Sequence, residues 1–160
     1  PGASLVTSDQ VVAALDQVGV APSVSHRVSP LTLGLGANMP VSMEGVAVEV
    51  LSVGHGAGRH ADVANLAHIV HLGGLKFLHV GDADFSQGVL EQFALGDQGI
   101  DVAFLPEWFL TDGAEFVRTH IRPRHIVAVH MPSGPHRGGA GVGAFPDAVP
   151  FVRMLERRYY

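Results

Sequence analysis

Short runs of apolar residues recur along the chain, and most of them have the character of strands. In the segment 46–53, apolar residues occupy most positions and valine dominates, which is typical of a strand buried on both faces. Two similar runs, 66–72 and 76–80, flank a Gly-Gly pair that favours a hairpin turn. Further runs follow at 102–105 and 125–129. The pattern predicts a sheet built from these segments.

Helical spacing occurs in the segments between and around the strands. Ser8 directly precedes apolar residues at helical spacing, which predicts a short helix with Ser8 as its N-cap. We also predict a helix capped by Ser86 over 86–99, one starting near Asp112, and a last one over 149–158. The alternation of strands and helices predicts an α/β fold with helices packed on a sheet.

Length and composition narrow the possible classes of protein. The 160 residues predict a single domain over 1–160, and 47% hydrophobic against 16% charged residues favours a covered sheet over a helical bundle. The net charge of −5 offers no basic surface for phosphates, so we expect no nucleic-acid partner. Without a membrane-spanning stretch or a signal peptide in the sequence, we expect a cytoplasmic protein with no membrane partner.

Three polar residues follow the carboxyl ends of predicted strands. These are His55, Asp82 and His130, and α/β folds gather ligand-binding groups at this edge. Because cysteine is absent, a metal would have to bind histidine or carboxylate. Two imidazoles and a carboxylate suit zinc, manganese or iron, and such a site activates water for hydrolysis. A lone histidine after a strand is more often structural, so spacing alone leaves that alternative open.

Several segments of the chain resemble the second half of the metallo-β-lactamase fold. They are GHG at 54–56, LAHIV at 66–70, KFLHVGD at 76–82, DVAFLP at 101–106 and IRPRHIVAVH at 121–130. Within that superfamily they look most like the metal-dependent hydrolases related to ascorbate-6-phosphate lactonase. The resemblance covers roughly residues 1–132 and implies an α/β fold of the αββα type. Only the second half of the sandwich is expected here, as one partial domain.

The resemblance also implies roles for particular residues. His55 would be the third histidine of the first metal site, Asp82 the carboxylate shared by two metals, and His130 the last histidine of the second site. The implied activity is hydrolysis of a lactone, phosphoester or similar bond in a small-molecule substrate, with a divalent metal: zinc, or else manganese or iron. We predict that Asp84 orients a ligand or caps a helix, and that Trp108 lines the pocket.

The other histidines are expected to have ordinary structural roles. His79 lies on a predicted strand and is expected to pack or form hydrogen bonds inside the protein. The same expectation of an ordinary role applies to His26, His60, His68, His71, His120, His125 and His136.

The defining motif of the family, His-x-His-x-Asp-His, does not occur in this sequence. Without it, His55 with Asp82 and His130 with Asp82 give each metal two protein ligands, whereas catalytic zinc normally has three. We therefore expect a domain truncated at its amino-terminal end, which binds up to two ions only when the missing motif is supplied. The alternative is a non-catalytic remnant domain that acts in binding or homo-oligomer assembly, because an incomplete sandwich leaves an apolar face to cover. A phosphate-binding doubly wound domain is disfavoured, since no clear helix start follows the glycines at 54–58.

Overall fold

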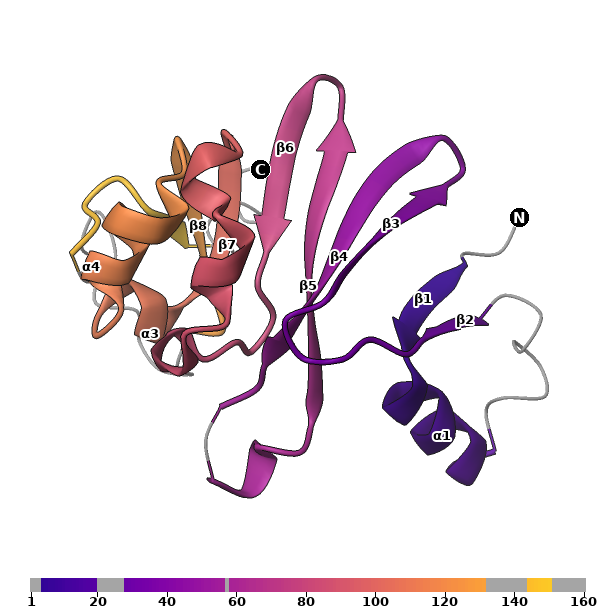
Figure 1. The fold of residues 1–160 in the computed structure, drawn as a ribbon. Helices are drawn as coiled ribbons and strands as arrows, with labels where there is room; N and C mark the ends of the chain where they lie inside the picture. The colour runs from indigo at the N-terminus through magenta and orange to yellow at the C-terminus, as the bar shows by residue number, and fades with distance from the viewer. Residues whose placement is uncertain (1–3, 20–27, 57, 132–143, 151–160) are drawn as a thin grey trace, which may run out of the picture.

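The computed structural model describes residues 4–19, 28–56, 58–131 and 144–150. Its strands are β1 (Leu5–Ser8), β2 (Val28–Leu31), β3 (Asn38–Met43), β4 (Val46–Gly54), β5 (Ala64–Leu72), β6 (Leu75–His79), β7 (Val102–Pro106), β8 (His125–Val129) and β9 (Val149–Pro150). Strands β3 to β9 form one sheet in sequential order, and β1 and β2 form a separate parallel pair (Figure 1). The larger sheet is the frame on which the rest of the described chain is arranged.

The helical segments are short. They are α1 (Asp9–Gln17), η2 (Gly58–His60), η3 (Phe85–Gln87), η4 (Leu90–Phe93), η5 (Leu95–Asp97), α3 (Glu107–Leu110), α4 (Ala114–Phe116) and the π-helical η6 (Val117–Ile121). Figure 1 shows α3 and α4 beside β7 and β8, whereas α1, β1 and β2 lie on the other side of the sheet. No helix within the described ranges is long and apolar enough to span a membrane.

The strands follow the apolar pattern of the sequence. The five runs predicted as strands form β4, β5, β6, β7 and β8, with ends shifted by a residue or two. Gly73 and Gly74 form the turn between β5 and β6, and both have positive φ angles, of 60° and 79°. This two-residue turn fixes the register by pairing Leu72 with Leu75. The predicted hairpin is confirmed.

Two of the predicted helices differ from the structure. The helix expected over 86–99 is wrong: the segment forms the separate turns η3, η4 and η5, because Gly88 and Ala94 adopt left-handed φ angles of 71° and 46° that interrupt a helix. Asp84 rather than Ser86 caps the first turn. The helix expected over 149–158 is wrong at its first two residues, which form β9, and residues 151–158 lie outside the described ranges.

The other two predicted helices are present. In α1, the hydroxyl of Ser8 accepts a hydrogen bond of 3.3 Å from the backbone N–H of Val11, as expected for an N-cap. The helix expected near Asp112 begins at Ala114 as α4 and continues as η6. These helical segments connect strands. The directions of the strands are given by how they pair in the sheet.

Strand direction brings the ends of three strands to one edge. β3 to β6 pair antiparallel, whereas β6 to β9 pair parallel. Two reversals separate β4 from β6, so these two strands run the same way, and β7 and β8 share that direction. The carboxyl ends of β4, β6 and β8 therefore lie at a common edge of the sheet.

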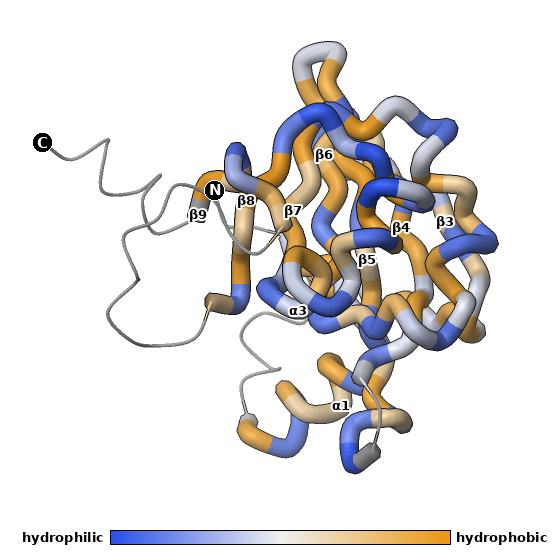
Figure 2. Tube along the Cα trace, turned by 90° about the vertical axis from the view of Figure 1, so that its left-hand side faces the viewer, coloured by the Kyte–Doolittle hydropathy of each residue, from blue (hydrophilic) through white to orange (hydrophobic). Residues whose placement is uncertain are grey.

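One face of the sheet carries the hydrophobic core. Leu51, Ile69, Leu78 and Leu105 are fully buried at alternating positions of β4, β5, β6 and β7. They belong to the same cluster as apolar residues of α3 and η6, including Phe109. Figure 2 shows the hydrophobic stretches along these strands. Burial on this face fixes the register of the strands, since a slip by one residue would turn the core side chains outward.

The opposite face of the sheet is less covered. Val48, Val70, Phe77 and Val102 lie side by side across β4 to β7 and are half-buried. The β1–β2 pair lies over one part of this face and leaves a cleft of about 570 Å³, with apolar lining residues Val6, Leu31, Val41, Met43 and Val46. In the described chain, two short strands therefore form the only strand layer facing the large sheet.

Candidate functional site

The loops that follow β4, β6 and β8 meet at the common edge of the sheet. A pocket of about 410 Å³ opens there, and its lining residues are His55, Gly56, His60, Asp82, Ala83, Asp84, Trp108 and His130. The three residues that the sequence predicted as metal ligands thus lie in one pocket, together with Asp84 and Trp108. They come together through strand direction, because they are 27 and 48 residues apart along the chain.

The carboxylate of Asp82 lies between the two histidines. Its Oδ2 atom is 3.7 Å from Nε2 of His55, and its Oδ1 atom is 3.9 Å from Nε2 of His130. Both distances exceed that of a hydrogen bond. Two donors that each bind one ion at about 2 Å lie at most about 4 Å apart. Each pair of atoms is therefore close enough to share an ion.

The position of Asp82 is fixed from behind by Asn65. This asparagine is buried on β5; its Nδ2 donates to the carbonyl of Val80 at 3.0 Å, and its Oδ1 accepts from the N–H of Asp82 at 3.2 Å. Gly81 between them has a φ of +62°, and a Cβ there would collide with Oδ1 of Asn65. The turn that presents Asp82 therefore requires both a glycine and a buried amide.

A second set of contacts joins the loop after β6 to the loop after β4. His55 forms a β-bridge with Ala83, and the N–H of Asp84 donates to the carbonyl of Gly54 at 3.0 Å. Gln87 donates from Nε2 to the carbonyl of His55 at 3.0 Å. A Cβ on Gly54 would collide with this glutamine side chain. These contacts hold His55 and Asp82 at a fixed separation.

Asp84 acts as a cap in the structure. Its Oδ1 accepts hydrogen bonds from the N–H and the hydroxyl of Ser86, at 2.8 and 2.7 Å, and its Oδ2 accepts one from Gln87 at 3.3 Å. Partial burial raises the pKa of Asp84, but these hydrogen bonds together outweigh it, so the pKa lies below its ordinary value. The side chain is thus an ionised capping group that also contacts Gln87, the residue that holds His55.

Trp108 and His130 form the far wall of the pocket. The indole Nε1 of Trp108 donates to the carbonyl of Ala83 at 3.0 Å, and its ring meets that of His130 edge to face with centroids 5.0 Å apart. His130 has a left-handed φ of +51°, a conformation that costs a non-glycine residue about 1–3 kcal/mol and clusters at functional sites. The backbone turn after β8 directs this imidazole toward Asp82.

Two further histidines lie near the predicted ligands. His60, for which the sequence indicated an ordinary role, lines the pocket with its ring centroid 5.2 Å from that of His55. His79 accepts a hydrogen bond at Nδ1 from the N–H of Gly81 at 3.0 Å and pairs across the strands with His68. Burial lowers the pKa of both His68 and His79.

The residues fit a metal site in chemistry but not in number. The Nδ1 atom of His55 is buried and has no hydrogen-bond partner within the described part of the chain, and its Nε2 faces the carboxylate. Each carboxylate oxygen of Asp82 nevertheless faces only one histidine among the described residues. Within that part of the chain, no group of three or more donors could hold an ion. A catalytic zinc normally takes three protein ligands. The described residues therefore do not by themselves complete a metal site.

Two solved structures are similar to the chain. Igni18, a metallo hydrolase from the hyperthermophilic archaeon Ignicoccus hospitalis KIN4/I, matches 84% of this chain with a TM-score of 0.57 and 17% sequence identity. YhfI from Bacillus subtilis, a metallo-β-lactamase fold protein, matches 84% with a TM-score of 0.54 and 9% identity. The chain has the metallo-β-lactamase fold.

This finding confirms the fold predicted from the sequence. The chain spans 55% of the length of each of the two solved chains. At such low identity the likeness establishes the metallo-β-lactamase fold alone, so the assignment to the group around ascorbate-6-phosphate lactonase stays a prediction. No family model and no curated protein matches the sequence.

Sequence reasoning missed the residues that hold the site together. Asn65 is a polar residue in an apolar strand, and its alternation with the buried Ala67 and Ile69 indicates an inward side chain. That alternation was a signal for a buried polar group with a specific partner. Gln87 and His60 gave no such signal, because their contacts depend on how two loops meet.

Proposed function

We propose that this chain contributes part of the active centre of a metal-dependent hydrolase. The observation that carries the proposal is the placement of Asp82, whose two carboxylate oxygens each face one histidine, His55 or His130, at a distance that a shared ion would require. A carboxylate in this position is suited to bridge two ions. The metallo-β-lactamase fold and the description of one structural neighbour as a metallo hydrolase support the same class.

The proposal extends to the kind of reaction. The bond hydrolysed would be a lactone, a phosphoester or a similar bond in a small molecule, and the ion would be zinc, with manganese or iron as alternatives. The acidic net charge supports a small-molecule substrate over nucleic acid. The proposal also includes a cytoplasmic location. Up to two ions would bind, and each requires a further donor from outside the described residues.

The test compares the 160-residue chain with a version extended upstream at its amino-terminal end. We expect the extended version to retain a transition metal through gel filtration, measured by elemental analysis, and to hydrolyse bis-p-nitrophenyl phosphate or a lactone. Asp82→Asn should abolish both, because both histidine pairs share this carboxylate. An extended version without bound metal or turnover would contradict the proposal.

A second candidate function is a non-catalytic domain that acts in binding or in homo-oligomer assembly. Two observations favour it: the described residues lack a group of three metal donors, and an apolar face of the sheet around Phe77 is only half-buried. This candidate predicts a dimer without metal when the 160-residue chain is sized. A stable monomer with bound zinc would exclude it.

A further inference from the structure

Arg59 differs from the other arginines in the described part of the chain. Arg118, Arg122 and Arg124 each lie within 4 Å of a carboxylate. Arg59 has no carboxylate within that distance among the described residues, and its Nε donates a 2.9 Å hydrogen bond to Nε2 of His60. A guanidinium without a carboxylate beside it keeps its positive charge uncompensated, which leaves it available for an anion.

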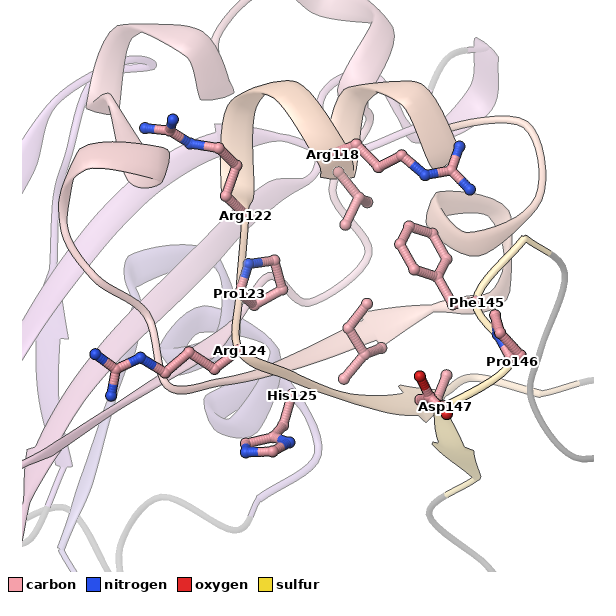
Figure 3. Close-up of a pocket in the computed structure, with 11 residues that line it drawn as sticks. Arg118, Arg122, Pro123, Arg124, His125, Phe145, Pro146 and Asp147 are labelled. Carbon is pink, nitrogen blue, oxygen red and sulfur yellow. The ribbon is translucent and has the colours of Figure 1, made fainter.

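The contrast is clearest at the pocket drawn in Figure 3. This pocket of about 240 Å³ lies among three arginines, but Arg122 and Arg124 extend away from Phe145 and pair with Asp97 and Asp101, respectively. Their charges are matched by carboxylates, so this arginine cluster does not form an anion site.

The hydrogen bond from Arg59 also orients His60. Because Nε2 of His60 accepts it, the imidazole edge faces the guanidinium. His60 lines the pocket of the proposed active centre, with its ring 5.2 Å from that of His55. Arg59 itself is not one of the lining residues, so the Arg59–His60 pair places a cation beside this pocket, on the turn η2.

The remaining charges of the pocket make this cation significant. The charged side chains among its lining residues are the carboxylates of Asp82 and Asp84, of which Asp84 is engaged by Ser86 and Gln87. Without bound metal, these carboxylates repel a negative group. Beside the pocket, the two Nη groups of Arg59 can bind such a group in the paired geometry that guanidinium offers to phosphate and carboxylate.

We propose that Arg59, positioned by His60, binds an oxyanion group of the substrate beside the pocket, so that the substrate is an anionic small molecule of the phosphate or carboxylate type. This proposal rests on the proposed hydrolase function of the same pocket. In this proposal, the loop after β4 selects substrates by their negative charge. Arg59 and His60 recognise that charge, whereas the predicted metal ligands serve the metal.

The test is an NMR titration of the metal-free 160-residue chain at one constant pH. The probes are phenylphosphonate, benzoate and neutral benzamide, and the signals followed are the Nε–Hε group of Arg59 and the imidazole of His60. We expect saturable shifts with at least one of the two anions and none with benzamide. The stronger of the two anions identifies the type of oxyanion.

Variants separate a specific site from general electrostatics. Arg59→Gln should weaken anion binding by about tenfold, the effect of losing one charge-assisted interaction. Arg59→Lys should give an intermediate loss, because it keeps the charge without the Nε donor to His60. Arg118→Gln, at a half-exposed arginine elsewhere, is the matched control and should bind like the wild type.

Several outcomes would overturn the proposal: no saturable anion binding, equal binding of benzamide, or equal weakening by Arg59→Gln and Arg118→Gln. The titration requires neither metal nor turnover. A failure of the hydrolase proposal would show as absent metal binding in the separate elemental analysis, so the two failures are distinguishable.

Discussion

The amide of Asn65 is expected to be a main stabilising group behind the site. Asn65→Ala removes two hydrogen bonds, one to the carbonyl of Val80 and one from the N–H of Asp82. Val80 is fully buried, so its carbonyl would lose its side-chain partner without access to water, whereas Asp82 is about half exposed and can be solvated. A buried polar group left without a partner costs about 1–3 kcal/mol. We expect a loss of about 2–3 kcal/mol in the free energy of unfolding.

Urea denaturation measures this loss directly. The chain has a single tryptophan, Trp108, which donates a hydrogen bond to the loop beside Asp82, so its fluorescence reports on this region. The matched control is Asn38→Ala, at an asparagine that is exposed on β3 and whose side chain donates a hydrogen bond to the side chain of Glu49. Surface substitutions of this kind usually change stability by about 0.5 kcal/mol or less.

The comparison has a clear negative result. If Asn65→Ala lowers the unfolding free energy no more than Asn38→Ala does, the buried amide does not hold the turn at Asp82. The account of how the strand edge positions the carboxylate would then have to be abandoned.

Two further substitutions test the backbone and the histidines. Gly81→Ala should destabilise the protein by about 1–3 kcal/mol more than Gly74→Ala, because both glycines have positive φ but only Gly81 would bring a Cβ against Asn65; equal losses in urea denaturation would refute this. Burial lowers the pKa of His68 and His79, so between their folded values and about 6.5 the unfolded chain binds more protons. The contribution of these two histidines to the unfolding free energy should therefore be fully present above about pH 6.5 and should be lost as the pH falls below it. His68→Gln should show a smaller decrease of the unfolding free energy with falling pH. An unchanged pH dependence in that variant would contradict the lowered pKa of His68.

The sheet could be predicted because its signals are local. Runs of apolar residues identify β4 to β8, and the Gly-Gly pair alone sets the hairpin at Leu72 and Leu75. The helix expected over 86–99 failed because apolar spacing does not reveal the left-handed residues Gly88 and Ala94. At such positions the backbone conformation depends on the packing of neighbouring loops, which periodicity does not encode.

The candidate site was predictable in part for the same reason. A polar residue after a strand is visible in the sequence, so His55, Asp82 and His130 could be selected before their proximity was known. The contributions of Asn65 and His60 depend on contacts between segments far apart along the chain. Only the assembled fold shows which of the many histidines share a pocket.

Zinc titration followed on the imidazole resonances tests the central claim most directly. The account predicts that Zn²⁺ added to the version extended upstream shifts the signals of His55 and His130 together, and that Asp82→Asn in this version removes both shifts, because each histidine faces one oxygen of that carboxylate. Shifts confined to other histidines such as His68, or shifts of His55 and His130 that persist in Asp82→Asn, would contradict a metal site built on this carboxylate.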